Sequence, residues 1–453
     1  ILDTLEEAAD FIGDDVDEIF LEKLSDVRME LISRCTPKPA YRIAQPDPAV
    51  LAVFDRLQAT LRRPQSELGE ILYNLLNALE NDAEDAESVI SSYSFAYAAT
   101  AQQSEGKDIK RAKGTMRNGH PEYETVIIDE AARVNPGDLM IPMSQAKRRI
   151  ILVGDHRQLP HIYDEEIFES MRNDGDEIKK DIVTKSMFEY IKENLEKLER
   201  IDHIPRTITL DAQYRMHPVL GEFVNCNFYA PYGEGFESPL GEAYFQQGLS
   251  PKPYMWIDLP YRLGDERRKG ISRQRECEAD CIVGSIQAYL NSPEGSDLTY
   301  GVITFYRAQK DMICDKLRGA GLLDKVRVGS VDAFQGMEFD VIFLSVVRTH
   351  GGNATFDETL LGKDTSSLDR NGEEYAEWLA YREKIGMRYY GRLVSENLLC
   401  VALSRQKRLL IVVGDSTIFH KGKWDELAEK CVPAMRHFYE LCENGGMVIH
   451  GTA

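Results

Sequence analysis

The first part of the chain carries apolar residues at three- and four-residue spacing, with Glu, Asp and Arg between them. LEEAADFIGDDVDEIFLEKLSDVRMELI (5–32) and VLAVFDRLQATLRRPQSELGEILYNLLNAL (50–79) both show this spacing. Such a pattern is typical of amphipathic helices that bury one face. We therefore predict that residues 1–90 are helical.

From about residue 88 the pattern changes to short apolar runs that alternate with loops and helical text. These runs read as buried strands of parallel sheets, because strands covered on both faces lose the alternation of apolar and polar residues. The predicted strands are TVIID (125–129), RIILVGD (149–155), TITLDAQ (207–213), YGVITFY (300–306), VRVGSVDAF (326–334), DVIFLSVV (340–347) and RLLIVVGD (408–415). Helical segments between them indicate an α/β fold. Residues 350–392 begin as a segment rich in Gly, Asp and charge and continue as a helical stretch. For the segment, an ordered insertion and a surface loop are both open, and the length favours the loop.

Length and charge narrow the class of protein. A chain of 453 residues suggests two to four domains. The formal net charge of -21 excludes a protein that holds nucleic acid by a diffuse positive coat. Two basic stretches, 107–120 and 262–275, could form a local basic groove, although a solvated loop is the simpler interpretation of either.

The chain lacks signals for export or membrane insertion. No run approaches the roughly 18 apolar residues of a spanning helix, and the first twenty residues have no basic and apolar signal regions. The eight cysteines form no Cys-x-x-Cys pair, which favours reduced thiols. We expect an intracellular protein, cytoplasmic or nuclear, that does not associate with membranes.

Two carboxylates follow the first predicted strand directly. Asp129 and Glu130 stand where TVII ends, and the carboxyl edge of a parallel sheet is where such folds bind ligands. In this Walker B arrangement, Asp129 would hold Mg²⁺, directly or through water, and Glu130 would orient and deprotonate an attacking water. A solvated acidic turn is the commoner explanation of such a pair taken alone.

The next two predicted strands also end in polar groups. Gln158 follows the strand at 149–155 and could reach a terminal phosphate. A plain turn after the strand, ended by a proline, is also compatible with this sequence. Arg215 follows the strand at 207–213, where an ordinary salt-bridging surface residue is equally compatible with the sequence.

Together and in this order, the three segments resemble the ATPase motifs of superfamily 1 helicases, in the branch that includes the RNA-surveillance helicase and senataxin. The later motifs of that family follow in the expected order at ITFYRAQ (303–309), VGSVDAFQGMEFDVIFLSVVRT (328–349) and NLLCVALSRQKRLLIVVGD (397–415). The resemblance implies two RecA-like parallel-sheet domains, the first incomplete at 91–205 and the second at 206–445, with residues 1–90 as an all-helical insertion.

The resemblance also implies an activity and a nucleotide site. It suggests a monomeric ATP- and Mg²⁺-dependent helicase or translocase that moves 5′ to 3′. Arg215 and Arg405 match the arginine fingers of the family, which neutralise charge on the transferred phosphoryl when the cleft between the domains is shut. Positions matching nucleotide contacts are Asp155, Gln213, Tyr214, Gly336 and Glu338.

A single strand of DNA or RNA is the partner that the resemblance implies, and protein partners are possible. The family binds its strand across both domains, mainly through phosphates. The matching backbone-contact positions are Thr100, Thr304, Ser330 and Thr349. Each of these hydroxyls could instead cap a helix or a turn.

One family motif is absent from the 453 residues. No Gly-x-x-x-x-Gly-Lys-Ser/Thr occurs, so the cradle for the β- and γ-phosphates is missing, and we expect its place to be just ahead of Ile1. On that basis the chain is most of a helicase that is inactive in ATP hydrolysis alone. The alternative is a nucleotide-incompetent helicase-like module that binds nucleic acid or a protein.

Overall fold

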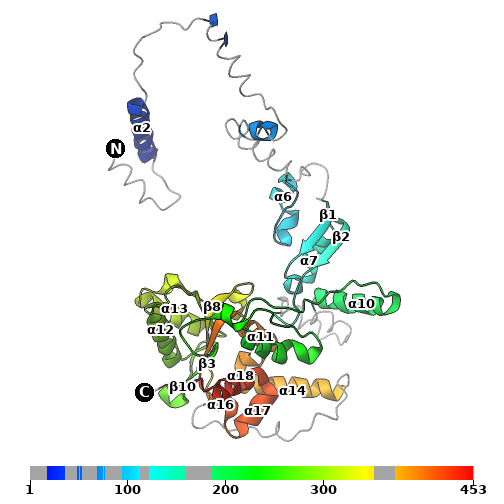
Figure 1. Cartoon of the computed structure of the whole chain (residues 1–453), viewed down its shortest axis with the longest axis vertical. Coiled ribbons are helices and arrows are strands. Elements are labelled where there is room, and N and C mark those ends of the chain that lie inside the picture. Colours follow the sequence, from blue (N-terminus) through cyan, green and yellow to red (C-terminus); the bar gives the residue numbers. More distant parts are fainter. Residues whose placement is uncertain are drawn as a thin grey trace. The chain divides into compact units, whose positions relative to one another are not determined.

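A computed structural model describes residues 18–35, 48–49, 52–53, 69–74, 76, 94–112, 122–159, 186–350 and 373–451. The chain divides into two compact units, Ile1–Ala96 and Tyr97–Ala453 (Figure 1). In the first unit, helix α2 covers Glu18–Cys35, in agreement with the predicted helical spacing. The rest of the helices predicted within 1–90 falls mostly outside the described residues.

A six-stranded parallel sheet forms the centre of the second unit. The strand order is β10-β3-β9-β8-β6-β7, and every neighbouring pair is parallel. The strands are β3 (Tyr254–Asp258), β6 (Tyr300–Thr304), β7 (Val326–Ser330), β8 (Phe339–Ser345), β9 (Gln406–Gly414) and β10 (Val448–His450). The central strands β6, β8 and β9 are almost wholly buried, as their continuous apolar runs predict.

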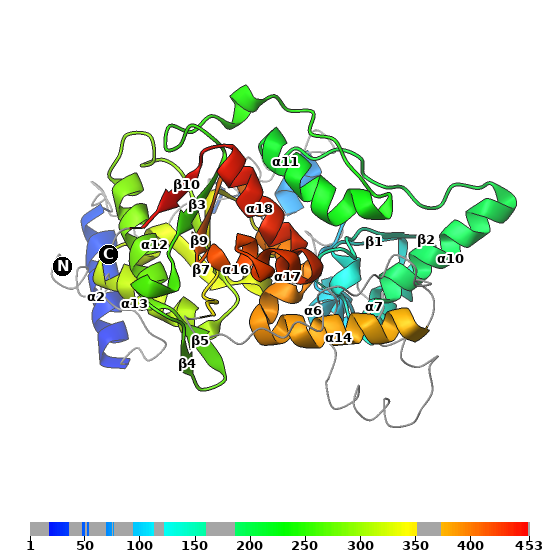
Figure 2. The ribbon, with the colours of Figure 1, turned by 90° about the horizontal axis from the view of Figure 1, so that it is seen from below.

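Helices cover both faces of this sheet (Figure 2). On one face lie α12 (Glu276–Leu290) and α13 (Arg307–Gly319), both at the positions predicted from their spacing. The other face is covered by α16 (Thr417–His420), α17 (Lys423–Cys431) and α18 (Pro433–Asn444). Further helices are α11 (Pro218–Val224), α14 (Glu373–Tyr389) and α15 (Glu396–Ala402). The resulting core is a single large apolar cluster.

A smaller parallel sheet precedes the large one in the chain. Strands β1 (Tyr123–Ile128) and β2 (Ala146–Leu152) pair in parallel, and α7 (Pro136–Met143) connects them. Helices α6 (Lys107–Ala112) and α10 (Met187–Asp202) complete this region. The fold is therefore mixed α/β with parallel sheets.

The structure departs from the sequence predictions at three strands. Residues 207–213 form no strand: their only ladder contact is an isolated bridge, Ala212 to Glu237, and Ile208 and Leu210 are 88% and 79% exposed. The bridge supplies two backbone hydrogen bonds, Gln213 amide to Glu237 carbonyl and Glu237 amide to Asp211 carbonyl, and the ladder goes no further. Strands β3 and β10 were not predicted.

Of the segment 350–392, residues 351–372 lie outside the described residues. Helix α14 is the helical stretch predicted in the later part of this segment.

In the described part of the chain, no helix has both the length and the apolar character needed to cross a membrane.

Candidate active site

The acidic turn after β1 is held in an unusual backbone conformation. Glu130 has φ 52°, in the left-handed region that residues other than glycine seldom adopt, and its amide donates to Asp129 Oδ1 at 2.9 Å. Such conformations concentrate at functional sites. The Glu130 carboxylate is exposed and accepts a hydrogen bond from Gln335 Nε2 at 3.1 Å.

The loop after β2 lies directly beneath this turn. A Cβ added to Gly154 would stand 2.9 Å from the Ala132 amide nitrogen, so only glycine allows the two turns to approach this closely. Asp155 then organises the loop: its carboxylate accepts from the Arg157 amide at 2.9 Å and from Gln158 Nε2 at 2.7 Å. This hydrogen bond fixes the side-chain amide of Gln158 and leaves its oxygen, Oε1, available to accept from another group.

Two arginines of the predicted set come from elements far along the chain. Arg215 follows the 207–213 segment, pairs with Glu338 at 3.2 Å, and donates to the Ser404 carbonyl at 3.3 Å. Arg405, directly after Ser404, donates to Gln158 Oε1 at 3.3 Å. The structure therefore brings Gln158, Arg215 and Arg405 together, whereas sequence order separates them by as many as 247 positions.

The Arg405 guanidinium is buried without a counter-ion. Its side chain is 1% exposed, and its partners are Val401 O, Ser404 Oγ and Gln158 Oε1, all of them neutral. No carboxylate of a described residue forms an ion pair with it. Burial, with the nearby Arg215 charge adding to it, lowers the pKa of Arg405 to about 10. A buried cation without a partner is costly, and an anion bound beside it would remove that cost.

Helix α15 also holds the Gln158 loop from the other side. Asn397 Nδ2 donates to the carbonyl oxygens of His156, Arg157 and Gln158 at 3.3, 3.0 and 2.6 Å. Tyr229 adds a second link, since its hydroxyl donates to Asp155 and accepts from Cys400 Sγ at 3.5 Å. Burial raises the pKa of the Cys400 thiol to about 12, so the thiol keeps its proton.

A cavity of about 230 Å³ opens beside the same loop, with His156, Arg157, Tyr232 and Asn397 among its lining residues. The Arg157 guanidinium lies 3.6 Å from the centre of the Tyr232 ring. Glu234 accepts from Arg157 at 2.7 Å, so the cation is held between a ring and a carboxylate. These contacts fix the loop that carries Gln158.

The remaining predicted nucleotide positions divide into two groups. Glu338 and Gly336 lie near the arginines: Glu338 also pairs with Lys407 at 2.6 Å, which lowers the pKa of its carboxyl. Gln213 is engaged within its own turn, accepting from the amides of Arg215 and Met216 at 3.0 and 2.7 Å. Tyr214 is exposed at the surface.

The predicted nucleic-acid positions differ widely in exposure. Thr100 is exposed, and its hydroxyl accepts from the Gln103 amide at 3.3 Å. Ser330 is half-buried at the start of the short helix Val331–Phe334, with no capping hydrogen bond from its side chain. Thr304 is 0% exposed, and Thr349 is also buried, with its hydroxyl bonded to Asp265. A single strand of nucleic acid could contact the hydroxyls of Thr304 and Thr349 only after the groups that cover them had moved.

Three residues of this site were missed by sequence reasoning. They are Gln335, which bonds to Glu130, and Tyr229 and Asn397, which hold the Gln158 loop. A signal existed for two of them, since Gln335 adjoins Gly336 and Asn397 is the first residue of NLLCVALSR. Nothing in the local text marks Tyr229.

An acidic pair at a parallel sheet edge, a glutamine in the next loop and two arginines from distant parts of the chain are typical of one class of protein, the P-loop NTPases built on RecA-like domains. The chain belongs to the family described as an AAA domain (AAA_12), whose model matches residues 183–417; a second AAA domain model (AAA_11) matches residues 37–165. Within that class it is a superfamily 1 helicase of the branch that includes the RNA-surveillance helicase and senataxin.

Curated relatives come from this branch. ATP-dependent helicase NAM7 of Saccharomyces cerevisiae is 30% identical over 249 residues, which are 50% of this chain and 22% of that protein. Helicase sen1 of Schizosaccharomyces pombe is 29% identical over 238 residues, covering 50% of this chain and 13% of the relative. The chain thus spans about a fifth of the length of the first curated relatives it matches.

Among solved structures, the helicase nonstructural protein 10 of an arterivirus aligns with 69% of this chain and 43% of its own, at 14% identity and a TM-score of 0.28. That similarity is too low to define the fold by itself.

Proposed function

We propose that this chain is the motor part of an ATP-dependent helicase that moves 5′ to 3′ along single-stranded DNA or RNA. The observation that carries the proposal is the buried Arg405 guanidinium, which has no carboxylate partner among the described residues and faces Gln158. A phosphate is the anion that a planar guanidinium in such a position suits best.

The residues present fit ATP and Mg²⁺. Beside the acidic pair, Gln335 Oε1 is buried and has no hydrogen-bond partner within the described ranges. When bound, ATP with Mg²⁺ supplies the phosphoanhydride bond whose hydrolysis drives movement. Asp129 would hold the metal, and Arg215 and Arg405 would neutralise phosphate oxygens.

Each of the chain's own groups has a defined task in this proposal. Glu130 Oε2 accepts the proton of the attacking water, and Gln335 holds that carboxylate in place. Gln158 is fixed by Asp155 and accepts from Arg405. A shift of Gln158 when the terminal phosphate leaves would therefore move the Arg405 guanidinium. The turn of Gln213 positions Arg215 by accepting two backbone amides.

The proposal is tested in the full-length protein that carries this chain. We expect phosphate release to be stimulated by poly(U) or poly(dT), and Glu130→Gln to reduce kcat by about 10²-fold or more while nucleotide binding is retained. Asp138→Asn is the control: it removes the charge of a half-buried carboxylate in the same region, one that is bonded to Gln102, and it should leave kcat unchanged. Unchanged turnover in Glu130→Gln would overturn the assignment.

The absence of the Walker A motif from the 453 residues favours a second candidate, a module that binds nucleic acid without using nucleotide. It predicts strand binding by the full-length protein with no stimulated phosphate release. Strand-dependent hydrolysis would exclude it.

A further inference from the structure

A short hairpin projects from the second unit at the carboxyl edge of the large sheet (Figure 2). Its strands, β4 (Arg267–Lys269) and β5 (Ser272–Gln274), are antiparallel and joined by Gly270 and Ile271. Gly270 has φ +63°, which suits the first central position of a type II′ turn. Ile271, at the tip, is fully exposed at 109%.

The outer strand of the hairpin consists of three cations. Arg267, Arg268 and Lys269 are all exposed, and none forms an ion pair with a described residue. Arg268 stands directly opposite Arg273 across the strands, a pairing of like charges that destabilises a hairpin. Arg273 is bonded to Glu266, which leaves Arg268 unneutralised. This arrangement gains stability when a polyanion lies against it.

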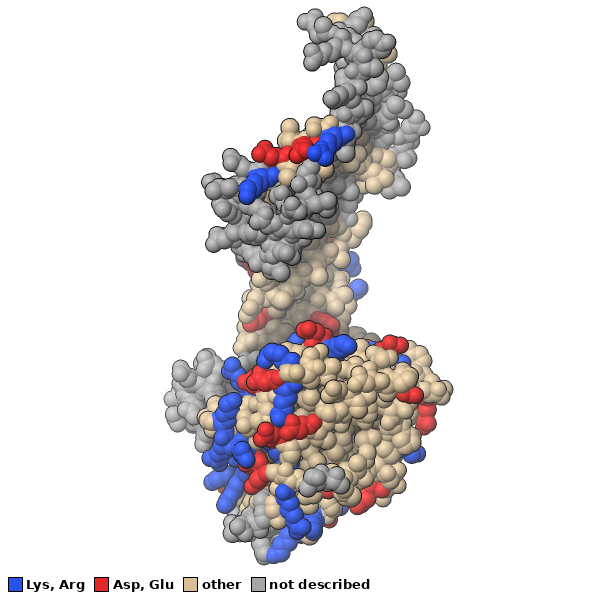
Figure 3. All heavy atoms as spheres, turned by 90° about the vertical axis from the view of Figure 1, so that its left-hand side faces the viewer, with Lys and Arg blue, Asp and Glu red and all other residues tan. Residues whose placement is uncertain are grey.

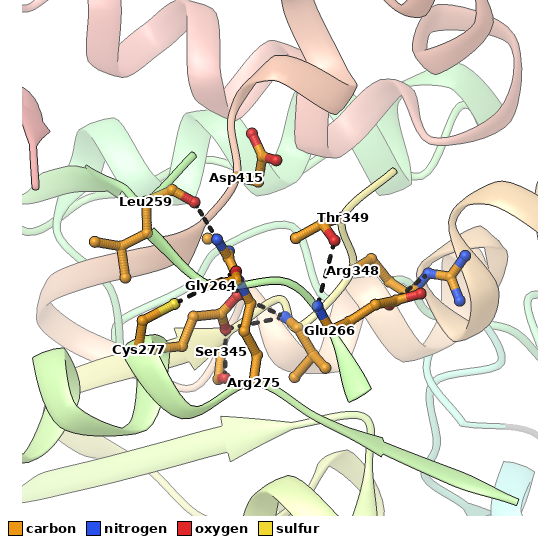
Figure 4. A network of polar contacts seen from close by, with 12 residues as sticks. Leu259, Gly264, Glu266, Arg275, Cys277, Ser345, Arg348, Thr349 and Asp415 are labelled. Carbon is orange, nitrogen blue, oxygen red and sulfur yellow. Dashed lines mark hydrogen bonds and ion pairs between the residues drawn. The ribbon is translucent and has the colours of Figure 1, made fainter. Parts of the chain in front are cut away.

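The hairpin stands on a buried polar network (Figure 4). Arg275, the residue after β5, pairs with Glu278 at 3.0 Å, and both side chains are 0% exposed. Arg275 also donates to the Leu259, Pro260 and Gly264 carbonyl oxygens, so both ends of the hairpin segment are fixed.

The same network continues into the end of β8. Glu278 accepts from Ser345 Oγ at 2.7 Å and from the Val347 amide at 2.9 Å. Val347 has φ 69°, which is strained for a β-branched residue. On the other side, Ser272 Oγ accepts from the Ala308 amide at 3.1 Å, at the start of α13. The exposed cations are therefore carried by a rigid base.

Buried polar atoms without a hydrogen bond gather around that base. Over the described residues, eight buried side-chain atoms lack a hydrogen bond. Five of them lie in the hairpin segment, at the end of β6 and in the segments that follow β6 and β8: Glu266 Oε2, Gln274 Oε1, Thr304 Oγ1, Tyr306 OH and His350 Nε2. Glu266 Oε2 still forms an ion pair with Arg348 at 3.5 Å. The base is therefore polar and buried, whereas the cations of β4 above it are exposed.

We propose that the β4–β5 hairpin is a nucleic-acid contact element, in which Arg267, Arg268 and Lys269 bind successive phosphates of a single strand and Ile271 packs against a base. This inference rests on the proposed function, and it adds which element of the second unit contacts the nucleic-acid strand. Lys and Arg side chains gather along one margin of the face that carries α12 and α13, although the chain as a whole is acidic (Figure 3). A single strand suits the site because its phosphates meet the cations while its unstacked bases reach an apolar tip.

The test measures binding of fluorescein-labelled U20 and dT20 to the 453-residue chain by anisotropy, without nucleotide. Arg267→Glu/Arg268→Glu/Lys269→Glu should weaken binding about tenfold or more at low salt. Replacing the three residues by Gln should reduce the slope of log K against log salt by about 2, because each phosphate contact on a single strand contributes about 0.7. Ile271→Ser, which adds no charge, should weaken binding without changing that slope.

The matched control is Lys252→Glu/Lys325→Glu/Arg327→Glu. These three cations are also exposed and form no ion pair among the described residues, but they lie by the amino ends of β3 and β7, at the opposite edge of the parallel sheet. The control changes the net charge equally and should bind nearly as the wild type does. Thermal melting of each variant verifies that it is folded.

The outcomes separate the two proposals. If the wild-type chain binds neither strand, the proposed function itself fails. If it binds and the hairpin and control variants weaken equally, the hairpin proposal is wrong while the proposed function stands. A loss on U20 but not on dT20 would show that the hairpin reads the sugar rather than phosphates, which also contradicts the proposal.

Discussion

The two parallel sheets of the second unit carry similar apolar runs but bury them very differently. In β8 and β9 almost every residue is buried, and Ile342 is 0% exposed. In β1 and β2, only Val126 and Ile128 are buried, while Ile127 is 66% exposed. An apolar run thus predicts a strand in both places, but burial depends on what the rest of the fold lays against it.

This difference has a functional side. The acidic pair Asp129 and Glu130 follows a strand with a small core, whereas Arg405 lies beside a strand in the large one. Rigid support is concentrated on the side of the arginines and the β4–β5 hairpin. The carboxylates and the guanidinium groups are accordingly held by regions of unequal stability.

The largest expected effect concerns a buried charge. Glu278→Ala should lower the free energy of unfolding by about 3 to 5 kcal/mol, because it leaves the buried Arg275 without a counter-ion. Glu130→Ala, in the exposed turn after β1, should change it by no more than about 0.5 kcal/mol. Urea unfolding followed by tryptophan fluorescence measures both, since all three tryptophans (Trp256, Trp378 and Trp424) lie in the second unit. Equal effects would contradict the comparison.

Matched isoleucines test the same contrast in the strands. Ile342→Ala should cost about 2 to 5 kcal/mol, because it opens a cavity in the large core. Ile127→Ala should cost about 0.5 kcal/mol or less, since that side chain is largely in solvent already. Hydrogen exchange of peptides covering β8 and β1 reports each strand separately, and faster exchange in β1 of the Ile127 variant would count against this account.

The smallest expected effect is the change in stability between pH 7.5 and pH 5.5. His350, after β8, stacks on Trp424 at 3.8 Å, and burial lowers its pKa to about 3. Its usual value is about 6.5, so between these values the unfolded chain takes up a proton that the folded chain does not. Stability is therefore complete above about pH 6.5 and falls as the pH drops towards 3, by up to about 1.4 kcal/mol per pH unit.

His350→Phe retains a stacked ring and should lose this component of the acid sensitivity. Urea midpoints at pH 7.5 and 5.5, compared between wild type and variant, measure it. If wild type and variant lose the same stability between the two pH values, the pKa of His350 is not lowered in the folded chain.

Much of the second unit follows from its apolar runs. The strands at 300–304 and 339–345 and the helix at 276–290 lie where the spacing predicts them. The segment 207–213 was predicted as a strand in the same way, yet its pairing is limited to one isolated bridge, Ala212 to Glu237. The local sequence indicates whether a segment tends to be extended, whereas its pairing with other strands depends on distant residues.

The candidate site shows the same division. Glu130, Gln158, Arg215 and Arg405 could be selected from order and residue type, and the structure brings the last three together. The Arg275–Glu278 pair could not be foreseen, because Arg275 lies in a stretch that reads as a basic surface, and its hydrogen bonds to the carbonyl groups of Gly264 and Pro260 form only in the fold. Roles that depend on what a side chain meets remain invisible until the chain is folded.

The amide of Asn397 has two hydrogens but serves three carbonyl groups. The three hydrogen bonds are consequently shared, and one rotation about the Asn397 side chain breaks all of them at once. The Gln158 loop then keeps its contacts through Tyr229 with Asp155 and through Arg157 with Glu234. One side-chain rotation can therefore remove a large part of the support of this loop while the rest stays in place.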